Sequence, residues 1–351
     1  MQGLDENSPL GMRMMQLSQS AGVSDYYITA WEPLAFKFNG GLRYDTFVFQ
    51  PEVAFESPPG YEDYALTLGG RRFRVNRMTT RGRSRWVMRL LPEEIPTPQD
   101  IAVPPGAIKA LMEAKNGIFL ICGPTGSGKT TTIAAMMKYR AQRRREHFVT
   151  FEDPIEYIYP DGMATLVSQR AIGEDDHDFG GALRASLRQA PDVIMVGEIR
   201  DGETAEIAMQ AAETGHVVVA TLHTSNVSGT VQRFLKLIPK ERVAAAQSSL
   251  ADILKMVLCQ RLVVDDEKNR RFAIHEMMLQ YDSTAALIRR GEFKKLDQEL
   301  ETGWRRGMIS FERSLDIRES EGWRSNLKEE TGFTAEDVSD YFRTEEEILA
   351  V

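Results

Sequence analysis

Residues 123–130 read Gly-Pro-Thr-Gly-Ser-Gly-Lys-Thr. The residues before them, 118–122, are all apolar, and residues 131–137 continue as Thr-Thr-Ile-Ala-Ala-Met-Met. This order predicts a buried strand, a glycine-rich turn and a helix, which is the context of a phosphate-binding loop. Because both flanks are of the right kind, a chance match of a glycine-rich turn is a poor explanation. The stretch predicts that the chain binds a nucleoside triphosphate.

Each part of this loop has a chemical role. Glycine lacks a β-carbon, so backbone N–H groups can curl around phosphate oxygens. The amino end of the following helix offers its positive dipole to the same oxygens. Lys129 is expected to reach the β- and γ-phosphates, and the Thr130 hydroxyl to ligate Mg²⁺. The predicted nucleotide-binding residues are Gly123, Pro124, Thr125, Gly126, Ser127, Gly128, Lys129, Thr130 and Thr131.

Around the loop the chain alternates between apolar strands and helical segments. Strands are predicted at 117–122, 147–152, 192–196 and 217–222, with helices between them. Nearly uninterrupted apolar strands joined by helical crossovers indicate a mainly parallel sheet covered on both faces. The fold class is therefore α/β, and this core is predicted to extend from 106 to 265.

The other parts of the chain differ in pattern. Residues 1–91 hold short segments that alternate with period two, with glycine pairs at 40–41 and 69–70, which predicts a small α+β domain with a largely antiparallel sheet. Five prolines in 92–105 predict a linker. Beyond about 240 the chain is predicted to be mostly helical, with a strand pair near 261–264 and 271–274. A C-terminal, mainly helical part is expected at 266–328 and an acidic tail at 329–351.

Charge, hydropathy and cysteine content indicate where the protein is located and whether it binds zinc. The net charge is −8, but the tail carries −7, so the rest carries only −1. There is no apolar run of membrane-spanning length and no signal-like start, so a cytoplasmic location is expected. Cys122 ends an apolar strand and Cys259 lies in an apolar stretch read as helical, which predicts two buried thiols. Without a Cys-x-x-Cys pair, no zinc is expected.

Acidic residues follow two of the predicted strands. Strand 192–196 runs into Gly197-Glu198, which places Glu198 where it can polarise an attacking water beside Mg²⁺. Strand 148–151 runs into Glu152-Asp153-Pro154-Ile155-Glu156, whose acids need cationic partners if they are buried. We predict Glu156 as an outer Mg²⁺ or water ligand, with Glu152 in support. The predicted metal residues are Thr130, Glu156 and Glu198.

Two further groups of residues have both a structural and a functional explanation. His216 and His223 bracket strand 217–222, where they are either structural or sensors of phosphate state for a neighbouring subunit. Residues 71–92 contain eight arginines and no acid. That segment is either a solvated strand face, an anion site or a contact between subunits.

Four sequence motifs, called boxes below, follow one another along the chain. Together they resemble those of the secretion and type IV pilus motor ATPases, most of all their pilus-retraction, or PilT-like, branch. They are 123–130; 150–156; Ala190-Pro191-Asp192 to Arg200-Asp201; and Ala212-Glu213-Thr214-Gly215-His216 to Thr224, followed by Thr230 and Arg233. The resemblance covers about 70–330 well.

The resemblance implies a fold, an activity and a set of residues. It implies a PAS-like N-terminal domain, a RecA-like ATPase core and a homo-hexamer with ATP and Mg²⁺ bound between the two domains. ATP hydrolysis would power type IV pilus dynamics and twitching motility through an inner-membrane platform protein, at the inner face of that membrane. Glu198 matches the catalytic carboxylate and Glu156 the acidic-box residue. The remaining residues implied to act at the nucleotide are Arg74, Arg81, Arg89, His216 and His223.

The branch of the family is less sharply defined. The chain has neither the longer N-terminal region nor the four-cysteine element of many extension and secretion motors, which favours retraction. However, Ser283–Arg290 departs from the Ala-Ile-Arg-Asn-Leu-Ile-Arg-Glu stretch of retraction motors. A motor of a related secretion or conjugation system is therefore an alternative. A nucleic-acid translocase using the arginines of 71–89 and Arg140, Arg143, Arg144 and Arg145 is a second one, although no direct nucleic-acid partner is expected.

Overall fold

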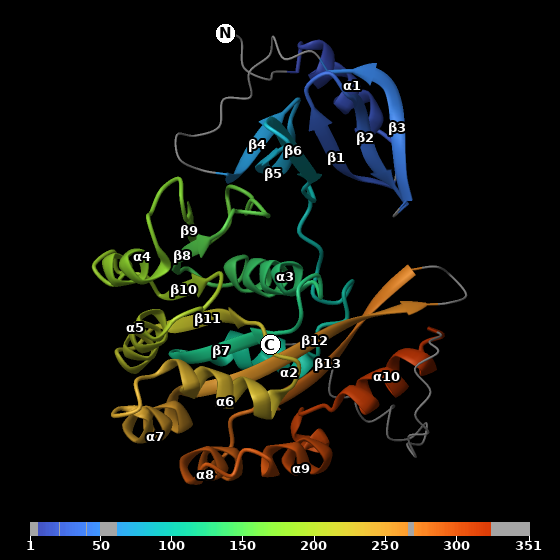
Figure 1. Cartoon of the computed structure of the whole chain (residues 1–351). Helices are drawn as coiled ribbons and strands as arrows, with labels where there is room; N and C mark the ends of the chain where they lie inside the picture. The colour runs from blue at the N-terminus through green and yellow to red at the C-terminus, as the bar shows by residue number, and fades with distance from the viewer. Residues whose placement is uncertain (1–5, 21, 40, 50–61, 266–269, 324–351) are drawn as a thin grey trace. The chain divides into compact units, whose positions relative to one another are not determined.

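The computed structural model describes residues 6–20, 22–39, 41–49, 62–265 and 270–323 (Figure 1). The predicted acidic tail, 329–351, lies outside the described residues. The chain divides into two compact units. The first comprises 1–95 together with 152–158 and 170–178, and the second comprises 96–151, 159–169 and the chain from 179 onward.

The first unit is built on an antiparallel sheet whose described strands follow the order β3-β2-β1-β6-β5-β4. Its helix begins at Pro9 because the Ser8 side chain accepts a hydrogen bond from the Gly11 N–H. The α+β prediction and the hairpin at 69–70 are confirmed, and the PAS-like label stays a prediction. The elements are α1 (Pro9–Ser18), β1 (Val23–Thr29), β2 (Pro33–Phe38), β3 (Gly41–Val48), β4 (Asp63–Leu68), β5 (Arg71–Thr80) and β6 (Arg83–Leu90).

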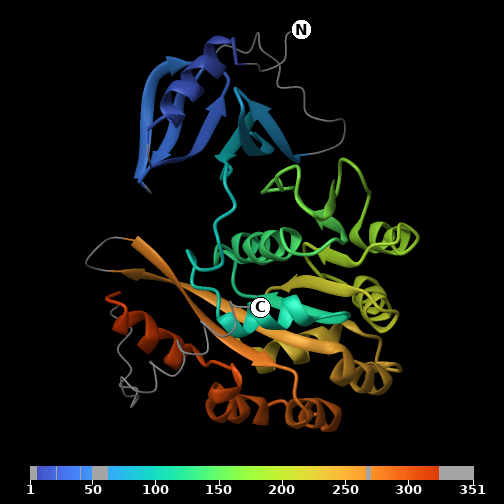
Figure 2. The ribbon, with the colours of Figure 1, turned by 180° about the vertical axis from the view of Figure 1, so that it is seen from behind.

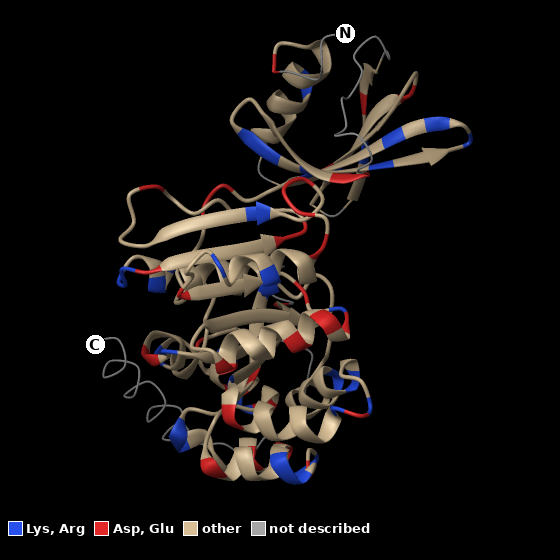
Figure 3. Cartoon of the chain, turned by 90° about the vertical axis from the view of Figure 1, so that its left-hand side faces the viewer, with Lys and Arg blue, Asp and Glu red and all other residues tan. Residues whose placement is uncertain are grey.

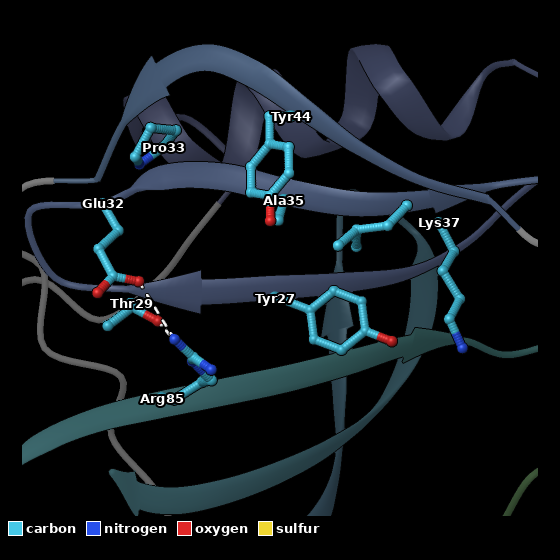
Figure 4. Close-up of a pocket in the computed structure, with 9 residues that line it drawn as sticks. Tyr27, Thr29, Glu32, Pro33, Ala35, Lys37, Tyr44 and Arg85 are labelled. Atoms are coloured by element: carbon cyan, nitrogen blue, oxygen red, sulfur yellow. Dashed lines mark hydrogen bonds and ion pairs between the residues drawn. The ribbon is translucent and has the colours of Figure 1, made fainter. Parts of the chain in front are cut away.

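Alternation along these strands separates a core face from an open face. Tyr26 and Met88 are buried in the core with Met14 of α1, and the Tyr26 hydroxyl donates to the Met14 carbonyl at 3.0 Å. The other face carries a shallow pocket of about 490 Å³, where Tyr27 and Tyr44 stand above the sheet (Figure 4).

The second unit contains a sheet with strand order β13-β12-β7-β11-β10-β8-β9. β12, β7, β11, β10 and β8 pair in parallel, and β13 pairs antiparallel with β12. The α/β class and the mainly parallel core are confirmed. The strands are β7 (Gly117–Cys122), β8 (His147–Glu152), β9 (Leu166–Ala171), β10 (Val193–Val196), β11 (Val217–Leu222), β12 (Leu254–Asp265) and β13 (Arg270–Leu279).

Helices pack on both faces of this sheet, because crossovers that run in opposite directions along the sheet leave their helices on opposite sides. α2 contacts α3, and α5 contacts α6 and α7, as Figures 1 and 2 show from the two sides. No helix among the described residues has both the length and the apolar character needed to cross a membrane. The helices are α2 (Pro105–Glu113), α3 (Lys129–Ala141), α4 (Phe179–Ser186), α5 (Gly202–Glu213), α6 (Val227–Leu237), α7 (Val243–Ile253), α8 (Asp282–Arg290), α9 (Lys295–Thr302), the 3-10 turn η1 (Trp304–Arg306) and α10 (Phe311–Ser320).

One secondary-structure prediction is wrong. The stretch around Cys259 was expected to be helical, but it belongs to β12. A short apolar run suits a strand or a helix equally, and pairing with β7 and β13 decides the matter. Cys122 and Cys259 are register partners on adjacent strands, and both thiols are buried, as predicted.

Candidate nucleotide site

The phosphate loop has the backbone that only glycine tolerates. Gly123, Gly126 and Gly128 have φ values of 153°, 79° and 86°. A β-carbon on Gly123 would lie 2.5 Å from the backbone oxygen of Gln260. A β-carbon on Gly128 would lie 2.8 Å from the side-chain Nε2 of the same residue. Gly128 ends the turn, and α3 begins at Lys129. The predicted order of strand, turn and helix is confirmed.

The side chains of this loop suit a phosphate ligand. Pro124 and Thr125 are exposed, whereas Ser127 is buried and its hydroxyl has no hydrogen-bond partner among the described residues. The Lys129 ammonium donates to the carbonyls of Gly123 at 2.8 Å and Pro124 at 3.2 Å. A turn of glycines with a buried unsatisfied hydroxyl at a helix amino terminus fits an anion. Thr130 and Thr131, partly exposed, lie in the first turn of that helix.

A chain of polar contacts links the loop to the end of β10. Lys129 Nζ lies 3.5 Å from His223 Nδ1, and His223 Nε2 lies 3.4 Å from Glu198 Oε1. Because an ammonium only donates, Nδ1 acts as the acceptor, which leaves the ring proton on Nε2, facing the carboxylate. Arg200 Nε approaches the other oxygen of Glu198 at 2.7 Å. The structure therefore brings Lys129, His223 and Glu198 together at one place.

Parallel strands explain why these groups meet. β7, β11 and β10 are neighbours and run in one direction, so the residues that follow them gather at one edge of the sheet. The Gly197 N–H donates to the Phe151 carbonyl at 2.7 Å, and the Thr221 hydroxyl donates to the Gly197 carbonyl. These two bonds hold the turn that carries Glu198. Oxygen donors such as the Thr130 hydroxyl and the Glu198 carboxylate are the ligands that Mg²⁺ prefers.

His216 lies elsewhere. It precedes β11, at the opposite end of that strand from His223. Its Nδ1 lies 2.9 Å from the Ala211 carbonyl and 3.3 Å from the Thr214 hydroxyl. These local contacts account for its position, and its predicted role stays a prediction.

In the first unit, the acidic segment meets two arginines of β5. Arg72 donates to the carbonyls of Ile155 at 2.7 Å and Glu156 at 3.1 Å. Arg74 pairs with Asp63 at 2.7 Å and approaches Glu156 at 3.7 Å. Asp63, with added attraction from Glu156, raises the pKa of Arg74. Arg74 and Glu156 are thus brought together, and their predicted roles at the nucleotide stay predictions.

The other two predicted arginines lie apart from Arg74. Arg89 pairs with Asp25 at 2.8 Å on the sheet. Arg81 is exposed in the turn between β5 and β6, with φ of 50°. Figure 3 shows the basic residues of these strands as blue segments. Their predicted roles at the nucleotide stay predictions.

Three buried polar residues around the loop were not predicted: Thr132, Gln260 and His275. Thr132 donates to Gln260 Oε1 at 2.6 Å, and Gln260 Nε2 donates to the Ser127 carbonyl at 2.5 Å. The available signal was a single glutamine after the apolar run Met256–Cys259, since a polar residue in a buried strand needs a partner.

The buried carboxyl group of Glu276 on β13 is expected to make the stability of the fold depend on pH. It accepts a hydrogen bond from the Val227 N–H at 2.6 Å, and burial raises its pKa to about 7. The folded state thus holds this proton better than the unfolded state, whose value is near 4.5. The stability it supplies is present below about pH 4.5 and is lost as the pH rises towards 7.

Replacing Glu276 with glutamine should therefore raise the free energy of unfolding at pH 8 and change it little at pH 4.5, because glutamine keeps the acceptor for the Val227 N–H. Urea unfolding at the two pH values measures this. Glu301→Gln, at an exposed position on α9, is the control. A gain at pH 8 that is no larger than at pH 4.5 would contradict the assignment.

Comparison with known proteins places these features in a family. The family model described as "Type II/IV secretion system protein" matches residues 62–310. YggR of Escherichia coli is 35% identical over 322 residues, covering 88% of this chain and 98% of the relative. The type IV pilus retraction ATPase PilT of Pseudomonas aeruginosa is 32% identical over 319 residues, covering 86% and 92%.

A solved structure agrees with these sequence matches. The crystal structure of the pilus retraction motor PilT with bound ADP superposes with a TM-score of 0.80 at 31% identity, covering 94% of this chain and 96% of that one. The similarity to PilT-like motor ATPases drawn from the four boxes is confirmed. The chain belongs to the type II/IV secretion system protein family.

Proposed function

We propose that this protein is a motor ATPase that hydrolyses ATP to power type IV pilus dynamics of the retraction type. The observation that carries the proposal is the contact chain from Lys129 through His223 to Glu198 beside a complete phosphate loop. This arrangement joins the phosphate-binding cation to the predicted catalytic carboxylate. Relatives of this chain include a pilus retraction ATPase and a protein named for twitching motility.

The roles of the site residues follow from their chemistry. The loop amides and Lys129 bind the phosphates, and Glu198 orients and polarises the attacking water. Thr130 and Glu198 would hold Mg²⁺, which would neutralise charge on the phosphate oxygens. His223 is proposed to sense whether the γ-phosphate is present, which its contacts with Lys129 and Glu198 support. Glu156, Arg74, Arg81, Arg89 and His216 are proposed to complete the site within the assembled motor.

We further propose that the working form is a homo-hexamer that acts on an inner-membrane platform protein from the cytoplasmic side. Phosphoryl transfer needs cations arranged around the transferred group. Arg81 and Arg89 lie at separate places in the first unit, which suits arginines that serve a neighbouring subunit. Hydrolysis would then move the two units of each subunit relative to each other.

One observation favours a second candidate, a motor of a related secretion system. α8, which corresponds to the stretch typical of retraction motors, lacks that stretch's first arginine and terminal acid. Its remaining arginines bind locally, since Arg289 pairs with Asp252 and Arg290 approaches Glu292 at 3.6 Å. Comparing twitching motility and protein secretion in cells with and without this chain decides between the two.

The nucleic-acid translocase is disfavoured, because three of the arginines that it would use make local contacts. Arg140 is buried and pairs with Glu146 at 2.7 Å. Arg143 stacks on Tyr139 at 3.7 Å, and Arg144 donates to the Met112 carbonyl at 2.6 Å. Phosphate tracks need cations that are available to the backbone of the nucleic acid.

Size-exclusion chromatography with and without ATP tests the proposal directly. Phosphate release should appear in fractions of six-subunit mass and stop when EDTA removes Mg²⁺. The physical reason is that a complete site needs both the metal and residues of the neighbouring subunit. A chain that stays monomeric at high concentration with nucleotide, and releases no phosphate there, would contradict it.

A further inference from the structure

A buried glutamine forms hydrogen bonds with the phosphate loop and with the helix that follows it. Gln260 lies on β12, next to β7, and only 3% of its surface is exposed. Its side-chain amide donates to the Ser127 carbonyl at 2.5 Å, and its oxygen accepts from the Thr132 hydroxyl at 2.6 Å. One side chain therefore binds both the turn and the first residues of α3.

The bond to Ser127 has a consequence for the ligand side of the loop. A trans peptide points its C=O and N–H in opposite directions. Because the Ser127 carbonyl points at Gln260, the N–H of Gly128 points away from it. The contact thus sets the direction of a loop amide of the kind that binds phosphate. Gly123 and Gly128 leave room for this approach, since a β-carbon on either would collide with Gln260.

A histidine fixes which way the Gln260 amide points. His275 Nε2 lies 3.2 Å from Gln260 Oε1, and only 1% of His275 is exposed. Burial lowers the pKa of His275 to about 3, so the ring is neutral near pH 7. As Oε1 can only accept, Nε2 carries the ring proton and donates. The His275 backbone N–H in turn donates to the Ser314 hydroxyl of α10 at 2.9 Å.

We propose that Gln260, oriented by His275, is a positioning residue that presets the phosphate loop for nucleotide. The proposal rests on the proposed ATPase function and adds a residue to its site. It also explains why a glutamine is buried directly after the apolar run Met256–Cys259 of β12, where an unpaired amide would be costly.

The first test is Gln260→Met, which keeps the length of the side chain and removes its three hydrogen bonds, to Ser127, Thr132 and His275. The KM for ATP and the dissociation constant for ADP should rise about tenfold, the equivalent of losing a hydrogen bond to a buried carbonyl. The kcat should fall by less than the KM rises, because Glu198 is untouched. Thr132→Val, which removes one bond only, should give a smaller rise in the same direction.

The matched control is Gln280→Met. Gln280 follows β13 and makes comparable bonds, to the Ala251 carbonyl at 2.9 Å, the Asp252 carbonyl at 2.7 Å and the Lys255 ammonium at 2.7 Å. It does not touch the loop, so ADP affinity should stay at the wild-type level. An equal loss in Gln280→Met and Gln260→Met would mean that general strand stability matters, and would overturn the proposal.

Gln260→Glu separates positioning from folding. Its carboxyl keeps the acceptor for Thr132 and His275, but when ionised it repels the Ser127 carbonyl instead of donating to it. ADP affinity should be poor at pH 8 and recover as the pH falls, because a protonated carboxyl donates again. The wild type should show no such recovery.

The outcomes are distinguishable. Wild-type ADP affinity in Gln260→Met, or in Thr132→Val and Gln260→Glu if Gln260→Met does not fold, overturns the positioning role and leaves the ATPase standing. A wild-type chain that binds no nucleotide overturns the proposed function itself.

Discussion

Replacing Glu198 with glutamine should lower the kcat for phosphate release by roughly 10²- to 10⁴-fold, the range associated with loss of a general base. Glutamine keeps the shape of the side chain and its hydrogen-bonding reach, but it cannot polarise water as a carboxylate does. ATP binding should persist or tighten, because the change removes a negative charge near the phosphates. Fluorescent-nucleotide titration and single-turnover phosphate release separate these two effects.

The change should do little harm to folding. Glu198 contacts Arg200, whose side chain is 58% exposed, and His223, whose side chain is 44% exposed. Exposed ion pairs of this kind contribute at most about 1 kcal/mol. Glu203→Gln is the matched control, since Glu203 lies at the start of α5 and pairs with Arg184. Unchanged turnover in Glu198→Gln would remove the assignment of the base.

Replacing Lys129 with alanine should weaken nucleotide binding and also slow turnover, by about 10²- to 10³-fold in kcat, which is typical for loss of one preorganised charge-stabilising donor. Lys129 has no substitute in the loop, where the other side chains are neutral. Its contacts with the Gly123 and Pro124 carbonyls place the ammonium at the turn. ADP titration and steady-state kinetics measure both losses.

The control for Lys129→Ala is Lys138→Ala, which removes the same charge from the last turn of the same helix. If the predicted site is right, Lys138→Ala should keep nucleotide affinity close to wild type. Wild-type affinity in Lys129→Ala would show that nucleotide binds elsewhere on the chain.

The sequence was sufficient for the parts of the site that follow local rules. A phosphate loop requires positive φ at particular positions, and glycine at 123, 126 and 128 meets that requirement within a few residues. Parallel strands bring their carboxyl ends to one edge, so Glu198 and His223 were predicted beside the loop from their places after β10 and β11. His216 was grouped with them in the prediction. It precedes β11, however, so it lies at the opposite end of that strand from His223.

The sequence was insufficient wherever contacts between distant segments decide the outcome. The assignment of 152–158 and 170–178 to the first compact unit depends on partners such as Arg72, which is far away along the chain. The prolines of 92–105 mark a change of sequence pattern. They do not indicate that the later segments 152–158 and 170–178 belong to the first unit. Composition also suggested a basic surface at 71–92, whereas acids from other segments, Asp25 and Asp63 among them, pair with its arginines.

What the sequence by itself determined is therefore the α/β core, the phosphate loop and the place of Glu198 after β10, because each depends on short-range backbone geometry and strand direction. What only the tertiary structure decided is how that loop is supported. Residues 254–260 suit a helix or a strand locally, and only their pairing with β7 on one side and β13 on the other makes them part of β12. That pairing places Gln260 beneath Ser127, a contact between residues 133 positions apart that no local pattern contains.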